Sequence, residues 1–154
     1  MSGGQTGKVV GIDPSITMIT EARQRTEELH LLIEFHQGSV YHLPFADETF
    51  DGGYSFLTFD ILERPQHALQ ELIRVTKAGG QVVISAPDHD TFIVNAPDRS
   101  LTRKLLHFIC DGTYSGWIGR QLPSFCMEAG LQEVAAIPDT FTLRSTDYAN
   151  QQTY

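Results

Sequence analysis

The sequence has few cysteines, no long apolar run and no excess of positive charge. Among its 154 residues only Cys110 and Cys126 are cysteines, which is too few for the disulfide framework of a small secreted domain. We therefore expect free thiols in a reducing compartment, the cytoplasm. No apolar run approaches the roughly 18 to 20 residues of a membrane span. Residues 1–7 lack the basic and then apolar pattern of a signal peptide, so we expect neither a leader nor a membrane partner.

Positive charge is also scarce. Eleven Lys and Arg stand against nineteen Asp and Glu, which gives a net charge of −8. A surface of this sign repels phosphate backbones, so we do not expect nucleic-acid binding. The 41% of hydrophobic residues excludes a disordered chain. The length predicts a single domain over residues 1–154, with a flexible start at 1–7 and a tail at 139–154 that no pattern assigns.

Apolar periodicity alternates between strand and helix along the chain. Strands are predicted at 8–13, 32–36, 50–56, 81–85 and 131–137, and helices at 15–29, from Pro65 to a stop at Gly79–Gly80, at 98–110 and at 116–129. The pattern predicts an α/β fold, a Rossmann-like and mostly parallel sheet with helices on both faces. The continuous apolar run at 8–13 predicts a strand buried on both faces, and the glycines inside 50–56 predict a weaker strand.

A ligand of such a sheet lies beyond the carboxyl ends of its strands. Asp13 ends the first predicted strand. Its carboxylate could accept hydrogen bonds from both hydroxyls of a ribose, because it has two acceptor oxygens and no donor. The alternative is that Asp13 only caps the helix that follows, for which Ser15 is the expected N-cap.

Three segments occur in order along the chain: Gly-Ile-Asp-Pro-Ser-Ile-Thr-Met at 11–18, Leu-Pro-Phe-Ala-Asp-Glu-Thr-Phe-Asp at 43–51, and Arg-Val-Thr-Lys-Ala-Gly-Gly at 74–80. Together they resemble the class I S-adenosylmethionine-dependent methyltransferases, in the branch of the ubiquinone and menaquinone biosynthesis enzymes. The resemblance covers residues 7 to about 137. It implies an enzyme that binds S-adenosylmethionine and transfers its methyl group to a small-molecule acceptor.

The resemblance also implies a set of cofactor contacts. Asp13 would hold the ribose hydroxyls. Pro14, Ser15 and Met18 would line the adenine, and Ser39 and Val40 would meet its edge, while Ser55 and Phe56 would lie near the methionine part. For Met18 and Phe56, packing in the core is the alternative. Ser39 stands where the family commonly has an acid, so we expect a weaker adenine subsite.

The sequence departs from the family at both ends. A first strand with its glycine-rich turn and a last strand are not found, so the fold is expected to be incomplete relative to the seven-stranded one. Without the central strand, a gap of roughly 10 Å would separate the strand at Val9 from the strand at Tyr54. Unpaired strand edges invite association, so we expect a homo-oligomer. Asp60 stands where relatives often carry His.

No catalytic residue is assigned from the sequence. Asp88 and His89, after a central strand, are candidates for deprotonating an acceptor, and a solvated turn is the alternative. The six histidines lack the paired spacing of a zinc site, so no metal is expected.

Two further features of the sequence each allow two interpretations. The basic patch of Arg99, Arg103 and Lys104 is expected to be a solvated helix face, with contact to an anionic substrate as the alternative. Trp117 could wall a substrate pocket or pack in the interior.

Two other functions remain. A non-catalytic methyltransferase-like fragment could act through self-association. A nicotinamide-dependent oxidoreductase would share the ribose-binding acid, but it does not explain the segment at 43–51.

Overall fold

The computed structural model describes residues 7–140, and in them helices and strands alternate as the periodicity predicts. The elements are β1 Val9–Asp13, α1 Ile16–Glu28, β2 Ile33–Gln37, β3 Phe50–Phe56, the short 3-10 helix η1 Phe59–Ile61, α2 Pro65–Val75, β4 Thr76–Ser85, the 3-10 helix η2 His89–Thr91, α3 Arg99–Gly112 and α4 Ile118–Glu128. The predicted α/β class is confirmed.

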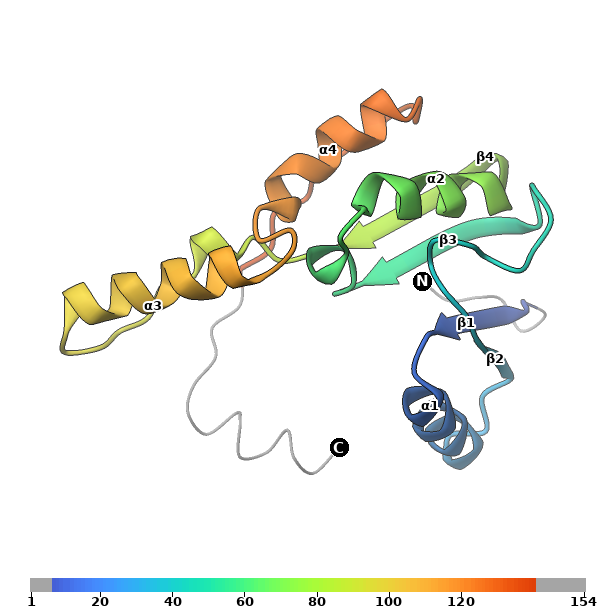
Figure 1. Cartoon of the computed structure of the whole chain (residues 1–154). Coiled ribbons are helices and arrows are strands. Elements are labelled where there is room, and N and C mark those ends of the chain that lie inside the picture. Colours follow the sequence, from blue (N-terminus) through green and yellow to red (C-terminus); the bar gives the residue numbers. More distant parts are fainter. Residues whose placement is uncertain (1–6, 141–154) are drawn as a thin grey trace.

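The four strands form two separate parallel sheets, β1–β2 and β3–β4. In the first, the register runs from Val9 opposite Ile33 to Asp13 opposite Gln37. Figure 1 shows β1 and β2 with α1 on one side of the molecule, set apart from β3 and β4 with α2. Within the described residues β1 and β3 are not hydrogen-bonded neighbours. The predicted interruption of the sheet is therefore confirmed.

The strands are less covered than the sequence predicts. The expectation that the first strand is buried on both faces is wrong, because Val9 is 49% exposed and the rest of β1 is only half-buried. In β3, Tyr54 and Phe56 are each 57% exposed and stack with ring centroids 6.3 Å apart. Each sheet has one packed helix, α1 against β1–β2 and α2 against β3–β4, so one face of each strand pair stays open.

The glycine at position 53 lets α2 pack closely on β3. A Cβ atom there would lie 2.6 Å from Cδ1 of Leu72, closer than atoms in a packed interior can approach without displacement. A side chain at position 53 would therefore displace Leu72 from its place against β3.

Two predicted element boundaries are wrong. The helix does not extend to a stop at Gly79–Gly80, because α2 ends at Val75 and β4 starts at Thr76. Gly79 does have a left-handed φ of 79°, but it lies inside β4, whose register with β3 shifts between Phe50 and Gly52.

The predicted strand at 131–137 is also wrong. Those residues form neither helix nor strand. The amide of Leu131 donates to the carbonyl of Cys126, 3.1 Å away, so the segment begins by closing α4. Positions 1–6 of the expected flexible start and 141–154 of the expected tail lie outside the described residues.

The hydrophobic core lies where η1, α2 and α4 meet. Its buried members are Phe59, Leu62, Ala68, Leu69, Ile118 and Leu122. By contrast, α3 extends away from the sheets (Figure 1), and of its residues only Cys110 is buried. No helix of the described part is both long and apolar enough to cross a membrane.

Arg74 fixes the loop between β2 and β3 to α2. Its guanidinium donates to the carbonyl oxygens of Leu43 at 3.0 Å and Phe45 at 2.8 Å. It also pairs with Glu71 at 2.7 Å and with Asp47 at 2.8 Å. Glu71 in turn accepts a 2.8 Å hydrogen bond from the amide of Leu43. This Arg74 lock joins two of the three segments that carry the family resemblance.

The lock should make stability depend on acid pH. The hydrogen bond from Arg74 holds the pKa of Glu71 at about 2, helped by the Leu43 amide and opposed by burial. A depressed pKa adds stability above the ordinary value of 4.5, which is lost as pH falls toward 2. We expect Glu71→Gln to lower the free energy of unfolding at pH 7 by about 1–3 kcal/mol. The difference from the wild type should shrink steadily below pH 4.5.

Urea unfolding at a series of pH values measures both effects. Glu63→Gln, at an exposed position just before α2, is the matched control and should follow the wild type throughout. A Glu71→Gln deficit that is the same at pH 7 and pH 2.5 would contradict the assigned role.

Candidate functional site

Asp13 lies at the carboxyl end of β1 and holds the turn into α1. Its Oδ1 accepts a 2.7 Å hydrogen bond from the amide of Ser15. Ser15 is the N-cap of α1, as predicted, and its hydroxyl accepts from the amide of Met18 at 3.4 Å. Asp13 is half-buried, and within residues 7–140 its Oδ2 has no protein partner. Asp13 therefore stabilises the turn with one oxygen and keeps the other as an acceptor.

The end of β2 lies directly beside this turn. The amide of Gly38 donates to the carbonyl oxygen of Asp13 at 3.1 Å, and the side chain of Gln37 donates to the carbonyl of Pro14 at 2.9 Å. These bonds bring residues 13–15 next to the loop that carries Ser39 and Val40.

The side chains expected around an adenine differ in their exposure and in their hydrogen bonds. The hydroxyl of Ser39 accepts from the amide of Tyr41 at 3.2 Å, so part of its acceptor capacity is used within its own turn. Val40 is half-buried, and Pro14 is exposed. Met18 is 52% exposed and thus does not pack in the core, which removes that alternative.

Ser55 and Phe56 belong to the other sheet. They pair with Ile84 and Ser85 at the carboxyl end of β3–β4. The arrows of β1, β3 and β4 point the same way in Figure 1, so their carboxyl ends face one side of the molecule. The structure thus gathers Asp13, Ser15 and Ser39 through one sheet, and leaves Ser55 and Phe56 on the second sheet without a hydrogen bond between the two.

Two surface hollows are formed by other residues. One, of about 570 Å³, lies along α3. The other, of about 340 Å³, lies over the Arg74 lock and is lined by residues 42–45 with Glu71 and Arg74. None of the predicted cofactor contacts lines either hollow.

The two candidate bases after β4 are partly buried, and each has a side-chain partner. Both carboxylate oxygens of Asp88 accept from the guanidinium of Arg120, one of them at 2.7 Å, so Asp88 is engaged in a bidentate ion pair. His89 is half-buried, and its Nε2 lies 3.1 Å from Oδ2 of Asp60, with the two side chains 13% and 10% exposed. The segment also differs from the solvated turn of the alternative interpretation, because residues 88 and 89 are only partly accessible and residues 89–91 form η2.

The partnership between Asp60 and His89 was not found from the sequence. In the sequence, Asp60 is only a departure from the family pattern. The His89 amide donates to the carbonyl of Gly116 at 2.9 Å, and the Ser115 amide donates to the carbonyl of Asp60 at 3.0 Å. The pair therefore joins η1 and η2 to the connection between α3 and α4. Nδ1 of His89 and Oδ1 of Asp60 are buried without a partner in the described part of the chain.

The two cysteines and Trp117 are further side chains that could take part in binding or catalysis. Both cysteines are free. Burial raises the pKa of Cys110, with the charge of Asp90 adding to it, and burial alone raises the pKa of Cys126. Neither thiol is therefore activated as a nucleophile. Trp117 is 51% exposed and stacks under the Arg120 guanidinium at 5.0 Å, so it is not an interior packing residue.

Comparison with known proteins identifies the family. Residues 2–84 match the family model described as a methyltransferase domain. Over 147 residues the chain is 33% identical to an uncharacterized 37.1 kDa protein in transposon TN4556 of Streptomyces fradiae, a match that covers 95% of this chain and 42% of that protein. Over 93 residues it is 39% identical to demethylmenaquinone methyltransferase of Bacillus cereus strain B4264, covering 58% of this chain and 38% of the relative.

A solved structure agrees on the fold. The S-adenosylmethionine-dependent methyltransferase of Aquifex aeolicus superposes with a TM-score of 0.62 at 24% identity, over 82% of this chain and 60% of that one. The chain spans about two-fifths of the length of the two curated relatives. Because the matched family model covers more than half of the 154 residues, the chain belongs to the methyltransferase domain family, the class I S-adenosylmethionine-dependent methyltransferases.

Proposed function

We propose that this chain binds S-adenosylmethionine at the carboxyl ends of β1 and β2 and takes part in methyl transfer to a small-molecule acceptor. The observation that carries the proposal is the carboxylate of Asp13, half-buried at a strand end, with one oxygen fixed by the Ser15 amide and the other unpartnered in the described residues. Family membership supplies the cofactor class.

The geometry around Asp13 fits a ribose diol. A carboxylate presents acceptors only, and the two hydroxyls of a ribose are donors. The Asp13–Ser15 hydrogen bond restricts the carboxylate to one orientation. The N-terminus of α1 follows directly, and its dipole favours the charged form of an acid at this place.

The adenine would lie over the adjoining loop. Pro14 and Met18, both exposed, supply apolar surface for its faces, and Ser39 and Val40 supply polar atoms at its edge. Ser39 is uncharged and already accepts from Tyr41, so its bond to the adenine amino group is weaker than that of an acid.

Ser55 and Phe56 would meet the methionine part from the second sheet. The cofactor supplies an electrophilic methyl group when bound, and the residues of this chain bind and orient it. Asp88 is held by Arg120 and His89 by Asp60, so no side chain is assigned as a base. We further place the chain in the cytoplasm, which its free cysteines support.

Asp13→Asn tests the site. Asparagine keeps an oxygen for the Ser15 amide, so the turn should persist while the charge is lost. Charge-assisted hydrogen bonds contribute about 1.5–3 kcal/mol each, so we expect S-adenosylhomocysteine to bind at least about tenfold more weakly by isothermal titration calorimetry. Asp51→Asn is the matched control and should bind like the wild type. Asp51 lies near the start of β3, away from the carboxyl ends of the strands, and its side chain is 92% exposed. Equal affinities for Asp13→Asn and the wild type would refute the assignment.

We also propose that the chain self-associates through the free side of β3. In the described residues β3 has a strand neighbour on one side only, and its open face carries the exposed Tyr54–Phe56 stack. An unpaired edge beside apolar side chains favours pairing with a second copy.

Sedimentation velocity tests the association. We expect the wild type to form dimers with rising concentration and Tyr54→Lys/Phe56→Lys to remain monomeric, because two charges on that face oppose pairing. Leu32→Lys, at a position 92% exposed just before β2, should leave the dimer unchanged. A wild type that sediments as a monomer at every concentration would exclude this interface.

A further inference from the structure

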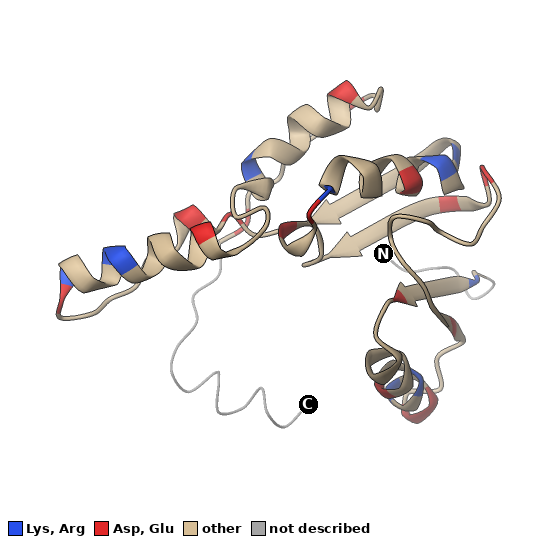
Figure 2. Cartoon of the chain, viewed as in Figure 1, with Lys and Arg blue, Asp and Glu red and all other residues tan. Residues whose placement is uncertain are grey.

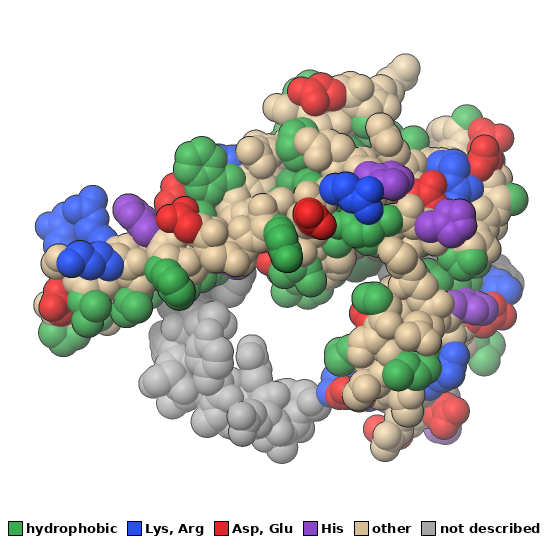
Figure 3. Space-filling view, in the orientation of Figure 1, with side chains coloured by type: hydrophobic (Ala, Val, Ile, Leu, Met, Phe, Trp, Pro, Cys, Tyr) green, Lys and Arg blue, Asp and Glu red, His purple; other side chains and the backbone are tan. Residues whose placement is uncertain are grey.

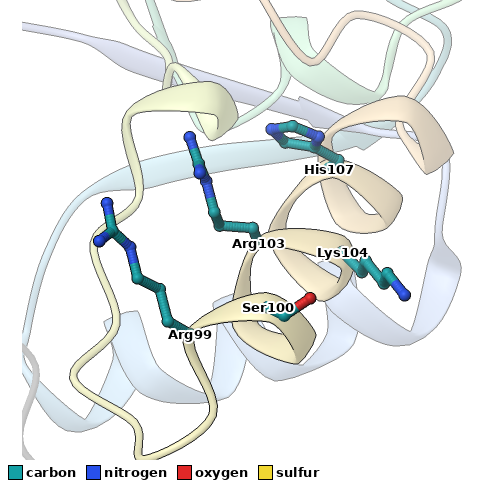
Figure 4. A pocket seen from close by; sticks show the side chains of 5 residues that line it. All are labelled: Arg99, Ser100, Arg103, Lys104 and His107. Carbon is teal, nitrogen blue, oxygen red and sulfur yellow. The ribbon is translucent and has the colours of Figure 1, made fainter.

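A cluster of basic side chains lies on α3, outside the candidate cofactor site. Arg99, Arg103, Lys104 and His107, together with Ser100, line the hollow of about 570 Å³; we call the four the α3 basic cluster. Figure 4 shows Arg99, Arg103 and His107 reaching to the same side of the helix from successive turns, while Lys104 points to the other side.

The α3 basic cluster lacks the partners that other basic residues have. Every other Lys or Arg within residues 7–140 contacts an acid, a carbonyl oxygen or an aromatic ring: Lys8 with Glu34, Arg23 with the Phe35 carbonyl, Arg25 with Glu21, Arg64 with the Tyr41 ring, Arg74 with Glu71, Lys77 with Asp51, and Arg120 with Asp88. Arg99, Arg103 and Lys104 form no such contact with the described residues. The chain has nineteen acidic residues, yet among residues 7–140 the Lys and Arg side chains without a partner all lie on α3.

The helix itself gains nothing from this arrangement. Like charges four residues apart on a helix repel each other, and Arg99 and Arg103 have this spacing. The nearby Asp98 already accepts from the amide of Leu101 at 2.9 Å as the N-cap. Figure 2 shows the basic positions in the N-terminal part of α3, and the one acid within the helix, Asp111, lies in its last turn. A bound anion would remove the repulsion, so the cluster is better explained by a ligand than by helix stability.

The spacing of the cluster fits an extended anion. From Arg99 to His107 the helix rises about 12 Å, which is longer than a single phosphate and suits linked phosphate groups or several neighbouring ones. Guanidinium groups bind phosphate oxygens in a bidentate manner. The net charge of −8 disfavours a long nucleic-acid backbone, because most of the surface would repel it.

An exposed apolar stripe runs along the same helix. Leu101 and Leu105 are each 52% exposed, Phe108 is 76% exposed and Ile109 is 46% exposed. Figure 3 shows apolar side chains along the lower edge of α3 and basic side chains above them near its free end. A helix with a basic face and an apolar face is the arrangement that binds anionic groups next to apolar material.

We propose that the α3 basic cluster is a binding site for phosphate groups, separate from the cofactor site. Arg99 and Arg103 bind the phosphate oxygens, the His107 ring adds a hydrogen-bond donor on the same side of the helix, and Lys104 extends the positive surface to the other side. The phosphates come either from a soluble polyphosphate compound or from the headgroups of an anionic lipid, in which case the apolar stripe lies against the acyl region.

Calorimetric titration with sodium tripolyphosphate at low ionic strength is the first test. We expect Arg99→Gln/Arg103→Gln/Lys104→Gln to weaken binding at least about tenfold. The matched control is Lys8→Gln/Arg23→Gln/Lys77→Gln, which removes the same charge elsewhere and should stay within about twofold of the wild type. Circular dichroism checks that both variants are folded. Equal weakening in the two variants would show that only net charge matters, and would overturn the site.

Vesicle co-sedimentation separates the two sources. If lipid headgroups supply the phosphate, the wild type binds phosphatidylglycerol vesicles and not phosphatidylcholine vesicles, and Leu105→Gln/Phe108→Gln reduces that binding while leaving tripolyphosphate binding intact. If the source is soluble, only tripolyphosphate binds. Absence of binding to both probes, or equal binding to both kinds of vesicle, would overturn the proposal. The tripolyphosphate and vesicle experiments do not test the Asp13 site, whose binding is measured with S-adenosylhomocysteine.

Discussion

Parallel pairing of the strands is the constraint on which the rest of the structure depends. β1 runs parallel to β2, and β3 runs parallel to β4. The loops that follow the two strands of a pair therefore lie at the same edge of their sheet. Parallel pairing brings the turn at Asp13 to the same edge as the loop at Ser39, and the loop at Asp60 to the same edge as the loop at His89. The strand pairs themselves are held by few buried side chains, so each depends on the helix that packs against it. Gly53 shows how close that packing is, since a single added methyl group would collide with Leu72.

Local pattern predicted most of the elements, because their signals lie within a few residues of one another. The capping of α1 by Ser15 is such a case: the hydroxyl and the amide that it satisfies are three residues apart. The pairing of Asp60 with His89 bridges 29 residues and depends on how two loops meet, which no local spacing encodes. The same limit explains the error at Gly79–Gly80. The sequence indicated a left-handed turn correctly, but the register between β3 and β4 decided that the turn belongs to a strand.

The segments that reveal the family and the residues that would bind its cofactor have different physical roles. Arg74 and the loop at 43–49 are tied by a network of charged hydrogen bonds that fixes the chain between two strands. Their resemblance to the family is therefore evidence for the fold. Asp13 differs because a helix already capped by Ser15 does not need its carboxylate charge. An acid that retains an oxygen with no partner in the described chain is evidence for a ligand. The cofactor proposal therefore rests on Asp13, whereas the fold does not depend on it.

The same reasoning distinguishes the charged groups of the whole chain. Where a charge has a partner, as in Arg120 with Asp88 or Lys77 with Asp51, its position is explained by the structure, and its removal changes packing or local order. A charge without a partner is free to meet a ligand. In the described residues the spare oxygen of Asp13 can accept from a ligand, and the cations of α3 can donate to one. The two sites have opposite charge and lie on different elements, so the chain can hold a donor-rich ligand at one and an acceptor-rich ligand at the other without competition between them.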